Sequence, residues 1–599
     1  MLSPDARSVY TAALTPPPGM VFEEGIAATF SLDPLVLLSV PVHLAFMGQG
    51  ADSLLDSLTA LEAIRRLAGR ITAYADLGRL QVPKRPHPLY GLLEPMIVEV
   101  EAPRGGAFHP KFWVLRFIDP EGDGSPLLRL MILSRNLTSD RSWDLALTLE
   151  GIPTRRYRAE NRALGKLIEA LPTYAKHDIE PARVTQAHRL AREVWCTPWE
   201  LPPGFSSVSL HVNGQRRKTW NPLDSTRMVI VSPFCSSEAL DWLTASTSKP
   251  KAVVSRAEEL AKISTEVRDR FACCLTLDEA AEIHDGEAPD EPGLRDAQGL
   301  HAKAFVYERG WDTHLIVGSA NATNAALLNP INIELLAELV GRRSKVGGID
   351  QLLGRDGIGG VLVKYEPEEE PPCGPEEPTD EKALEDARRQ IARSELHLRF
   401  SSDNRAGFWI PELVGDVAAP EGLSSARCWL ITTQQESAVD LQPLFDEGFV
   451  RLHPCSTESV TGLLALNLRA QASDRVLRFA LNLPVEGLPE GRDGAIFRLM
   501  VENKEAFLRY LLLLLGNIDA GAGPGNGNGW AFGSWGKGAA AKGLMEELVR
   551  AYCRDRERLK SISGIVERLQ SSEEGSAVIP PEFMKVWEVF LSAMEDNHV

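Results

Sequence analysis

The sequence predicts an α/β protein in which one structural unit occurs twice, followed by a mainly β domain and a helical C-terminal region. Two observations predict this class. Segments typical of strands alternate with segments typical of helices up to about residue 365, which favours a mixed or parallel sheet covered on both faces. In addition, the pattern His-x-Lys, apolar strand, Ser-x-Asn-x-Thr occurs in residues 109–138 and again in residues 301–323.

The first half is expected to cover residues 1–200. Apolar runs bounded by turn residues predict its strands, and apolar residues at helical spacing predict its helices. The expected elements are, in chain order, a strand at 34–40, a helix at 51–69, strands at 70–76 and 94–102, a hairpin of 108–117 with 127–134, a strand at 143–151 and a helix at 158–171. The stretch DPEGDGSP provides the turn of the hairpin.

The second half is expected to cover residues 201–365, and its pattern follows the same order. The expected elements are a strand at 227–234, a helix at 237–247, a strand at 251–255, a hairpin of 300–308 with 314–319, and strands at 331–341 and 360–366. Both copies of the His-x-Lys pattern therefore begin a predicted hairpin.

The rest of the chain differs in composition from the two halves. Residues 366–390 are rich in Pro and Glu and predict an acidic linker. Short strands separated by turns predict a β-rich accessory domain at 391–515. Residues 516–543 predict a Gly-rich loop, whose Gly-Lys pair lacks the preceding glycine and the following hydroxyl of a phosphate-binding P-loop. Residues 544–599 predict a helical region.

Composition excludes some classes of function. The 599-residue chain has a net charge of −18, which argues against unspecific attraction to nucleic acid or anionic membranes. Residues 155–192 nevertheless contain nine Lys or Arg against four Asp or Glu, and predict either a basic groove or the solvated face of two helices. The sequence has no bilayer-length apolar run, no signal-peptide pattern and no Cys-x-x-Cys pair among its eight cysteines, so we expect a cytoplasmic protein.

Each copy of the repeated pattern brings several polar groups to one place. Side chains two residues apart on a strand share a face, so each His lies beside a Lys, and each Ser beside an Asn. These imidazole, ammonium, hydroxyl and amide groups suit a phosphate. They are His109, Lys111, Ser134 and Asn136 in the first copy, and His301, Lys303, Ser319 and Asn321 in the second.

Two facing copies would hold one phosphorus atom between two imidazoles. One histidine can attack phosphorus in line, while the other protonates the leaving oxygen and then activates water to break the phosphohistidine. The lysines and asparagines would stabilise charge on the equatorial oxygens. This chemistry needs neither a metal ion nor another cofactor, and the sequence contains no carboxylate cluster typical of a metal site.

The paired motifs resemble those of the phospholipase D superfamily. HAKAFVYE with VGSAN is the closer match, and HPKFWVLRF with SRNLTSDRSWD is similar to the corresponding stretch of tyrosyl-DNA phosphodiesterases and superfamily nucleases. The resemblance covers both halves. The aspartate that the family has five residues after the lysine is Arg116 in one copy and Glu308 in the other, which favours a nuclease over a lipase. The first copy also has Leu133 where the pattern has glycine.

The resemblance implies a pseudo-two-fold active site with catalytic His109, Lys111, Asn136, His301, Lys303 and Asn321. It also implies one acidic residue that orients each histidine. Glu334 and Asp144 fit that role, although both could be ordinary charges at strand ends. Ser134 and Ser319 are expected to bind the phosphate or to support the groups that do. By analogy with related phosphodiesterases, His109 is the expected nucleophile.

Three functions follow as hypotheses. The first is a cytoplasmic, metal-independent phosphodiesterase acting on nucleic acid, with DNA as the expected substrate, in a bacterial restriction or anti-phage system beside a helicase or ATPase. The second is a phospholipase or phosphatidyltransferase, which predicts a membrane anchor or an exposed amphipathic helix. The third is a non-catalytic nucleic-acid-binding subunit. Two copies in one chain mean that a monomer suffices to complete the site, and the sequence is compatible with an oligomer as well.

Overall fold

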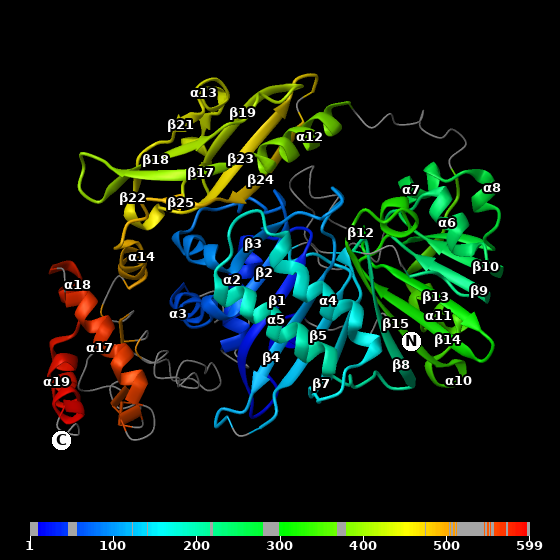
Figure 1. Ribbon diagram of the computed structural model, residues 1–599, viewed down its shortest axis with the longest axis horizontal. Helices are drawn as coiled ribbons and strands as arrows, with labels where there is room; N and C mark the ends of the chain where they lie inside the picture. Colours follow the sequence, from blue (N-terminus) through cyan, green and yellow to red (C-terminus); the bar gives the residue numbers. More distant parts are fainter. Residues whose placement is uncertain are drawn as a thin grey trace.

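The chain is a mixed α/β protein with several sheets and many helices, seen here in a computed structural model (Figure 1). The structure describes residues 10–45, 57–122, 124–139, 142–215, 220–278, 299–367, 379–473, 475–501, 556–570 and 573–595, and isolated residues between 504 and 552. The Gly-rich stretch predicted at 516–543 lies outside the described residues. No helix among the described residues is both long enough and apolar enough to cross a membrane.

The first half contains a six-stranded sheet in the order β3-β2-β1-β4-β5-β7. Strands β1, β2 and β3 are parallel, whereas β4, β5 and β7 are successively antiparallel. The bounds are β1 Val21–Thr29, β2 Ile71–Asp76, β3 Ile97–Val100, β4 Phe112–Ile118, β5 Leu127–Leu133 and β7 Ala146–Gly151. The accompanying helices are α1 Tyr10–Leu14, α2 Pro34–Ala45, α3 Ser57–Leu67, α4 Arg162–Ala170 and α5 Pro181–Cys196.

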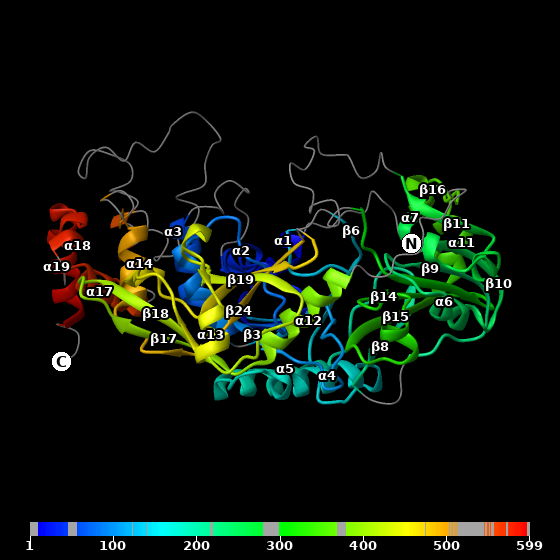
Figure 2. The ribbon, with the colours of Figure 1, turned by 90° about the horizontal axis from the view of Figure 1, so that it is seen from above.

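Alternation along β4 divides the apolar residues of this half between two cores. Trp113 and Leu115 pack in the core that includes residues of α2 and α3. Phe112 and Val114 pack in a second core that includes residues of α4 and α5. Because side chains alternate across a sheet, helices cover both faces, and α4 and α5 lie together along one of them (Figure 2).

The second half contains an eight-stranded sheet in the order β16-β11-β10-β9-β13-β14-β15-β8. Strands β9, β10 and β11 are parallel, and β13, β14 and β15 are successively antiparallel. The six inner strands thus have the order and directions of the first sheet. The bounds are β8 Phe205–Asn213, β9 Ser225–Val231, β10 Thr247–Val254, β11 Cys273–Leu277, β13 Ala304–Arg309, β14 Asp312–Gly318, β15 Glu334–Arg342 and β16 Leu362–Lys364, with helices α6 Ser237–Thr244, α7 Ala257–Lys262, α8 Thr265–Arg268, α10 Arg343–Val346 and α11 Ile349–Leu352.

One predicted strand is wrong. Residues 34–40 begin helix α2, and the strand that opens the first sheet is β1, which the sequence analysis did not place. Pro34 fits the first helical turn, and the Asp33 carboxylate accepts the N–H of Leu35 at 2.8 Å, so the chain has a helix start here. The helix is apolar on most sides because it is buried in the core, and a short apolar run alone does not distinguish such a helix from a strand.

The two halves lie side by side and join at two short parallel pairings (Figures 1 and 2). Strand β6 Ser142–Trp143 of the first half pairs with β12 Gly299–Leu300 of the second. Phe108 forms an isolated bridge with Ile333. One apolar core continues through both halves and contains residues of α4, α5, β5, β9 and β15.

The accessory region contains two further sheets, in the orders β21-β18-β17-β25 with β22 beside β18, and β20-β19-β23-β24. The strands are β17 Leu396–Ser402, β18 Phe408–Gly415, β19 Leu423–Leu430, β20 Val439–Asp440, β21 Phe449–Arg451, β22 Cys455–Ser456, β23 Leu463–Ala470, β24 Val476–Asn482 and β25 Val485–Glu486. Its helices are α12 Thr379–Arg393, α13 Gln442–Glu447 and α14 Arg492–Met500, followed by α17 Arg556–Gln570, α18 Glu573–Val578 and α19 Pro581–Glu595.

Helix α12 corrects the predicted linker, because residues 379–390 are helical. Leu384, Ala387 and Ile391 recur at helical spacing and are buried in the accessory core. Acidic residues in the first turn suit a helix start, so the acidic composition that indicated a linker also fits this helix. In Figure 1 the accessory sheets lie against the first half.

Candidate active site

Both histidines of the repeated pattern stand immediately before the first strand of a hairpin, and each is anchored to the opposite half. The N–H of His109 donates to the carbonyl of Ile333 at 3.0 Å, and the N–H of Ile333 donates to the carbonyl of Ala107. The N–H of His301 donates to the carbonyl of Trp143 at 2.9 Å. The short pairings between the halves therefore bring both motif copies to the boundary between the two sheets.

The histidine side chains are also paired across the two halves. His109 Nδ1 lies 2.9 Å from Glu334 Oε2, and His301 Nδ1 lies 3.0 Å from Asp144 Oδ1. Each imidazole thus meets a carboxylate of the other half. A carboxylate at Nδ1 favours the tautomer with the proton on that nitrogen and leaves Nε2 as the reactive atom.

The two lysines are buried between these pairs. Lys111 Nζ donates to the carbonyl of His109 at 2.9 Å, and Lys303 Nζ donates to the carbonyls of His301 at 2.9 Å and Ser134 at 3.3 Å. The Ser134 contact joins the second motif copy to the first. Lys111 is 1% exposed and Lys303 2%, and neither forms an ion pair with a described carboxylate within 4.0 Å.

Burial lowers the pKa values of both motif histidines and both motif lysines. It lowers the pKa of His109 to about 4 against the opposing effect of Glu334, and it also lowers the pKa of His301. Burial lowers the pKa of Lys303 to about 8 against the opposing effects of Asp144 and Glu334. Burial and the neighbouring Lys303 ammonium lower the pKa of Lys111 well below its usual value. Burial therefore disfavours the charged form of both histidines and both lysines.

The paired carboxylates keep their charged form. Burial acts to raise the pKa of Glu334 and Asp144, but the charge of the paired histidine and its hydrogen bond outweigh burial and lower both values. Glu334 side-chain exposure is 1% and that of Asp144 is 12%. Both groups consequently stay ionised beside their imidazoles.

The two serines contact the carboxylates that hold the histidines, which fits the supporting role, one of the two roles expected for them. Ser134 Oγ donates to Asp144 Oδ1 at 3.0 Å and accepts the N–H of Leu145 at 2.8 Å. Ser319 Oγ donates to Glu334 Oε2 and accepts the N–H of Leu335 at 3.0 Å. In both copies the serine hydrogen is thus donated to the carboxylate, and the serine oxygen accepts the N–H of the residue that follows that carboxylate. These serines therefore orient the carboxylates.

The asparagines lie on loops that are held alike in the two halves. After Asn136, the N–H of Leu137 donates to Thr29 Oγ1 at 3.0 Å, and after Asn321 the N–H of Ala322 donates to Ser232 Oγ at 2.9 Å. The Oδ1 atoms of both asparagines are buried and have no hydrogen-bond partner among the described residues. An amide in this state can rotate to present its NH2 group to an anion.

Four residues near the site were not found from the sequence. The ring of Phe30 lies 5.2 Å from that of His109, and the guanidinium of Arg79 lies 4.7 Å from the Phe30 ring centre. In the second half, the guanidinium of Arg256 lies 5.0 Å from the Phe234 ring centre. Their only sequence signal is their place just after β1 and β2 in the first half and β9 and β10 in the second, where side chains meet at the strand ends.

The residues that replace the family's aspartate lie away from the histidines. Arg116 is near the far end of β4 and pairs with Glu193 at 2.9 Å. Glu308 is near the far end of β13, where it accepts the N–H of Ile349 at 2.8 Å. Both therefore hold neighbouring elements together. No cluster of three or more His, Cys, Asp or Glu suited to a metal ion occurs among the described residues.

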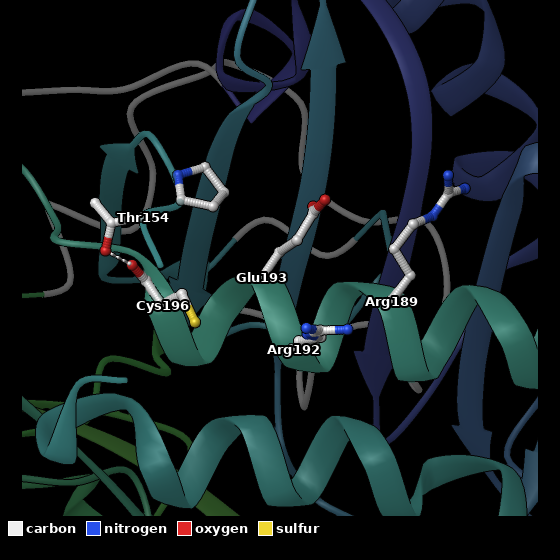
Figure 3. Close-up of a pocket in the computed structure, with 6 residues that line it drawn as sticks. Thr154, Arg189, Arg192, Glu193 and Cys196 are labelled. Atoms are coloured by element: carbon white, nitrogen blue, oxygen red, sulfur yellow. Dashed lines mark hydrogen bonds between the residues drawn. The ribbon is translucent and has the colours of Figure 1, made fainter. Parts of the chain in front are cut away.

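The basic stretch 155–192 leads to a surface pocket beside α5, with a volume of about 360 Å³ (Figure 3). Arg189, Arg192 and Glu193 line it from the helix, and Thr154 donates to the carbonyl of Cys196 at its edge. Arg189 is paired with Glu24, and Glu193 with Arg116. The charge of Arg189 is thus compensated within the first half.

Comparisons with known proteins add a distant structural likeness. A scan against models of protein families finds no match, and a search of curated proteins finds none. Among solved structures, the chain is similar to the crystal structure of phosphatidylserine synthase from Haemophilus influenzae Rd KW20, with 12% identity and a TM-score of 0.31. The alignment covers 64% of this chain and 90% of that chain. At this level of similarity, function has to be argued from the residues of the chain itself.

Proposed function

We propose that the chain is a metal-independent phosphodiesterase of the phospholipase D type, whose two halves arose by duplication and share one pseudo-two-fold active site. The matching strand orders of the two sheets support the duplication. So do the matching loop contacts of Thr29 and Ser232, each of which accepts the N–H that follows the motif asparagine. The reciprocal His–carboxylate pairs support the symmetry of the site.

One observation carries the proposal: two buried ammonium groups lie beside two oriented imidazoles without a carboxylate ion pair of their own. Isolated buried charges are costly unless they are paired. An anion bound between Lys111 and Lys303 would supply the missing negative charge. A phosphodiester has both that charge and a phosphorus atom that an imidazole can attack.

In the first step, Nε2 of His109 attacks phosphorus, and the bond from phosphorus to the leaving oxygen breaks. The Nε2–H of His301 gives its proton to that oxygen. Glu334 stabilises the imidazole of His109 as it gains positive charge, because it accepts the Nδ1 hydrogen. Lys111 and Lys303 stabilise the charge that builds up on the non-bridging oxygens.

In the second step, neutral His301 takes a proton from water, and the water oxygen attacks phosphorus. The P–N bond breaks, His109 returns to its neutral form and the products are a phosphomonoester and an alcohol. The burial of His109 supports its assignment as nucleophile, because a pKa of about 4 keeps its imidazole neutral over a wide range of pH. His301, which is 21% exposed, is then the acid and base.

We infer that the substrate is a nucleic acid, with DNA as the first expectation. The support comes from the departures from the lipase pattern at Arg116 and Glu308, and from the Arg–Phe pairs beside the histidines, which suit a phosphate next to a base. Both copies keep their His, Lys and Asn, which favours catalysis over a subunit that only binds. A role in anti-phage defence, with a helicase or ATPase partner, stays a prediction from the resemblance.

The test is cleavage of labelled single-stranded DNA, double-stranded DNA and RNA in the presence of EDTA. We expect cleavage by the wild type and none by His109→Ala or His301→Ala. His188→Ala is the matched control, because His188 is an exposed residue of α5 outside the site. Alkaline denaturation before the first turnover is complete should leave a nucleotidyl group on the protein, in a form that is stable to base and labile to acid.

Two results would contradict the proposal. Cleavage that stops in EDTA would mean that a metal ion is required, and cleavage that survives in both histidine variants would mean that the activity lies elsewhere. Hydrolysis of phosphatidylglycerol vesicles without cleavage of any nucleic acid would keep the chemistry but assign the substrate to the lipase class.

A further inference from the structure

The second half has an arginine and an aromatic ring immediately beside the motif histidine. Arg256 Nε donates to the carbonyl of Leu300, the residue before His301, at 3.2 Å. Its charge is close enough to Lys303 to lower the pKa of that ammonium. The guanidinium stacks on Phe234 at 5.0 Å from the ring centre. Arg256 and Phe234 therefore form one unit at the edge of the catalytic groups, which we call the Arg256–Phe234 pair.

This pair has unused binding capacity. Phe234 is 40% exposed, which is unusual for a large aromatic residue so close to buried groups. Arg256 is half-buried and forms no ion pair with a carboxylate of the described residues. A guanidinium has five N–H donors, and the Leu300 carbonyl takes the one on Nε. The two terminal nitrogens are thus available to a phosphate.

The first half contains a similar pair whose charge is already neutralised. The guanidinium of Arg79 lies over Phe30, which in turn contacts the ring of His109. Both terminal nitrogens of Arg79 donate to the Glu385 carboxylate of α12, at 2.9 and 2.7 Å. The accessory domain therefore occupies on this side the donors that are free at Arg256.

We propose that the Arg256–Phe234 pair is a subsite for the nucleotide next to the scissile phosphate, so that a bound strand extends over the second half of the protein. The guanidinium binds the neighbouring phosphate with its two terminal nitrogens, and the exposed ring stacks on the base or sugar. Stacking of this kind accepts any base, and the charged contact is independent of sequence. This inference rests on the proposed function, because that function identifies the ligand as a nucleic acid.

The test measures binding separately from cleavage. The full-length His109→Ala protein, which cannot turn over the probe, is titrated with a fluorescein-labelled thymidine oligonucleotide of about 12 nucleotides. Arg256→Gln and Phe234→Ala are each expected to raise the Kd about tenfold. Arg256→Gln should also reduce the slope of log K against log salt by about 0.7, whereas Phe234→Ala and Arg256→Lys should keep the slope.

Arg309→Ala is the matched control, because Arg309 is exposed at the far end of β13. Its Kd and slope should equal those of the parent. The inference is overturned if Arg256→Gln and Phe234→Ala bind like this control, or if the parent binds no single strand. Hydrolysis of bis(p-nitrophenyl) phosphate, which lacks flanking nucleotides, tests the proposed function alone. Failure of that hydrolysis with binding that depends on Arg256 would refute the chemistry and keep the subsite.

Discussion

The carboxylate that holds His301 and the one that holds His109 differ in their hydrogen bonds. Asp144 accepts hydrogens at both oxygens, from His301 and a serine at Oδ1 and from Ser142 at Oδ2, 2.7 Å away. Glu334 receives both of its hydrogens at Oε2, and its Oε1 is buried without a hydrogen-bond partner among the described residues. The same motif thus works in two environments.

The surroundings of the two motif copies also differ, because the first copy is more enclosed than the second. His109 is 15% exposed and His301 21%, so the first-half imidazole is the more enclosed. The accessory domain also touches the first half near this histidine, through Glu385 on Arg79. A symmetric pattern in unequal surroundings gives two imidazoles with different protonation behaviour. A reaction in which one histidine is the nucleophile and the other the general acid requires two histidines with different pKa values.

We expect the largest difference in kcat between the two motif copies when their carboxylates are replaced. Glu334→Gln should lower kcat about 10³-fold, because His109 loses both its fixed tautomer and the charge that stabilises its phosphorylated form. Asp144→Asn should cost less, since the more exposed His301 can reorient with solvent. Single-turnover hydrolysis of a nucleic-acid substrate measures both values.

The matched control for this pair is Glu338→Gln. Glu338 also lies on β15 and also holds a histidine, His314, at 2.8 Å, but it is outside the two-histidine site. It should leave kcat at the wild-type value. A larger loss for Asp144→Asn than for Glu334→Gln would reverse the assignment of nucleophile and acid.

A second comparison concerns the buried lysines, where activity and stability should move in opposite directions. Lys303→Met should reduce kcat about 10²-fold, because the transition state loses one charged donor. The same change should raise the free energy of unfolding by about 1 kcal/mol or more at pH 7, since a buried ammonium without an ion pair is removed.

Lys111→Met should lower kcat similarly and stabilise the fold at least as much, because the pKa of Lys111 is lowered well below its usual value. Urea unfolding measures the stability of both variants. Lys262→Met, which removes an exposed lysine paired with Glu259, is the control and should not stabilise the protein. If Lys303→Met and Lys111→Met both destabilise the protein, the two ammonium groups have sufficient partners in the folded state.

The pH dependence should reveal the two imidazoles separately. His109 has to be neutral, and its pKa of about 4 sets the acidic limb of kcat/KM. His301 has to be protonated, and its pKa, lowered by burial below 6.5, sets the alkaline limb. We therefore expect a maximum between about pH 4 and 6.5, with a loss of about tenfold per pH unit above it.

Stability should follow the same groups with a definite sign. A histidine whose pKa is lowered on folding stabilises the protein fully above pH 6.5 and loses that contribution as pH falls toward 4. Glu334 and Asp144, whose pKa values are also lowered, add to the loss in acid. A kcat/KM profile that is flat from pH 5 to 8 would contradict the assigned roles.

The sequence predicted both hairpins, because a hairpin is a local pattern. His109 and Lys111 lie just before β4, and His301 and Lys303 just before β13, although the predicted strands included them. The proximity of His109 to Glu334 follows from the backbone bonds between Ile333 and the His109 loop. Whether these residues catalyse a reaction is still a prediction.

Other features depend on contacts between distant segments, which local patterns do not specify. Local patterns left open whether the serines bind the phosphate or support the groups that do, and Ser319 is bonded to Glu334 because the strand carrying that carboxylate pairs beside it. Phe30 could not be placed because β1 was not predicted. Arg79 follows a predicted strand, but its partner Glu385 is over 300 residues away in the chain. An apolar run such as 34–40 also fits a buried helix.

The smallest expected effect tests why the two arginines differ. Glu385→Gln removes the negative charge that neutralises Arg79, whose side chain is 22% exposed. In the His109→Ala protein, this change should steepen the salt dependence of single-strand binding by about 0.7, because a second guanidinium becomes available to phosphate. Glu381→Gln, on the same helix but paired with Arg475, should not change the slope. An unchanged slope for Glu385→Gln would mean that the first-half pair lies outside the reach of the strand, so that position rather than neutralisation by the accessory domain accounts for the asymmetry of the site.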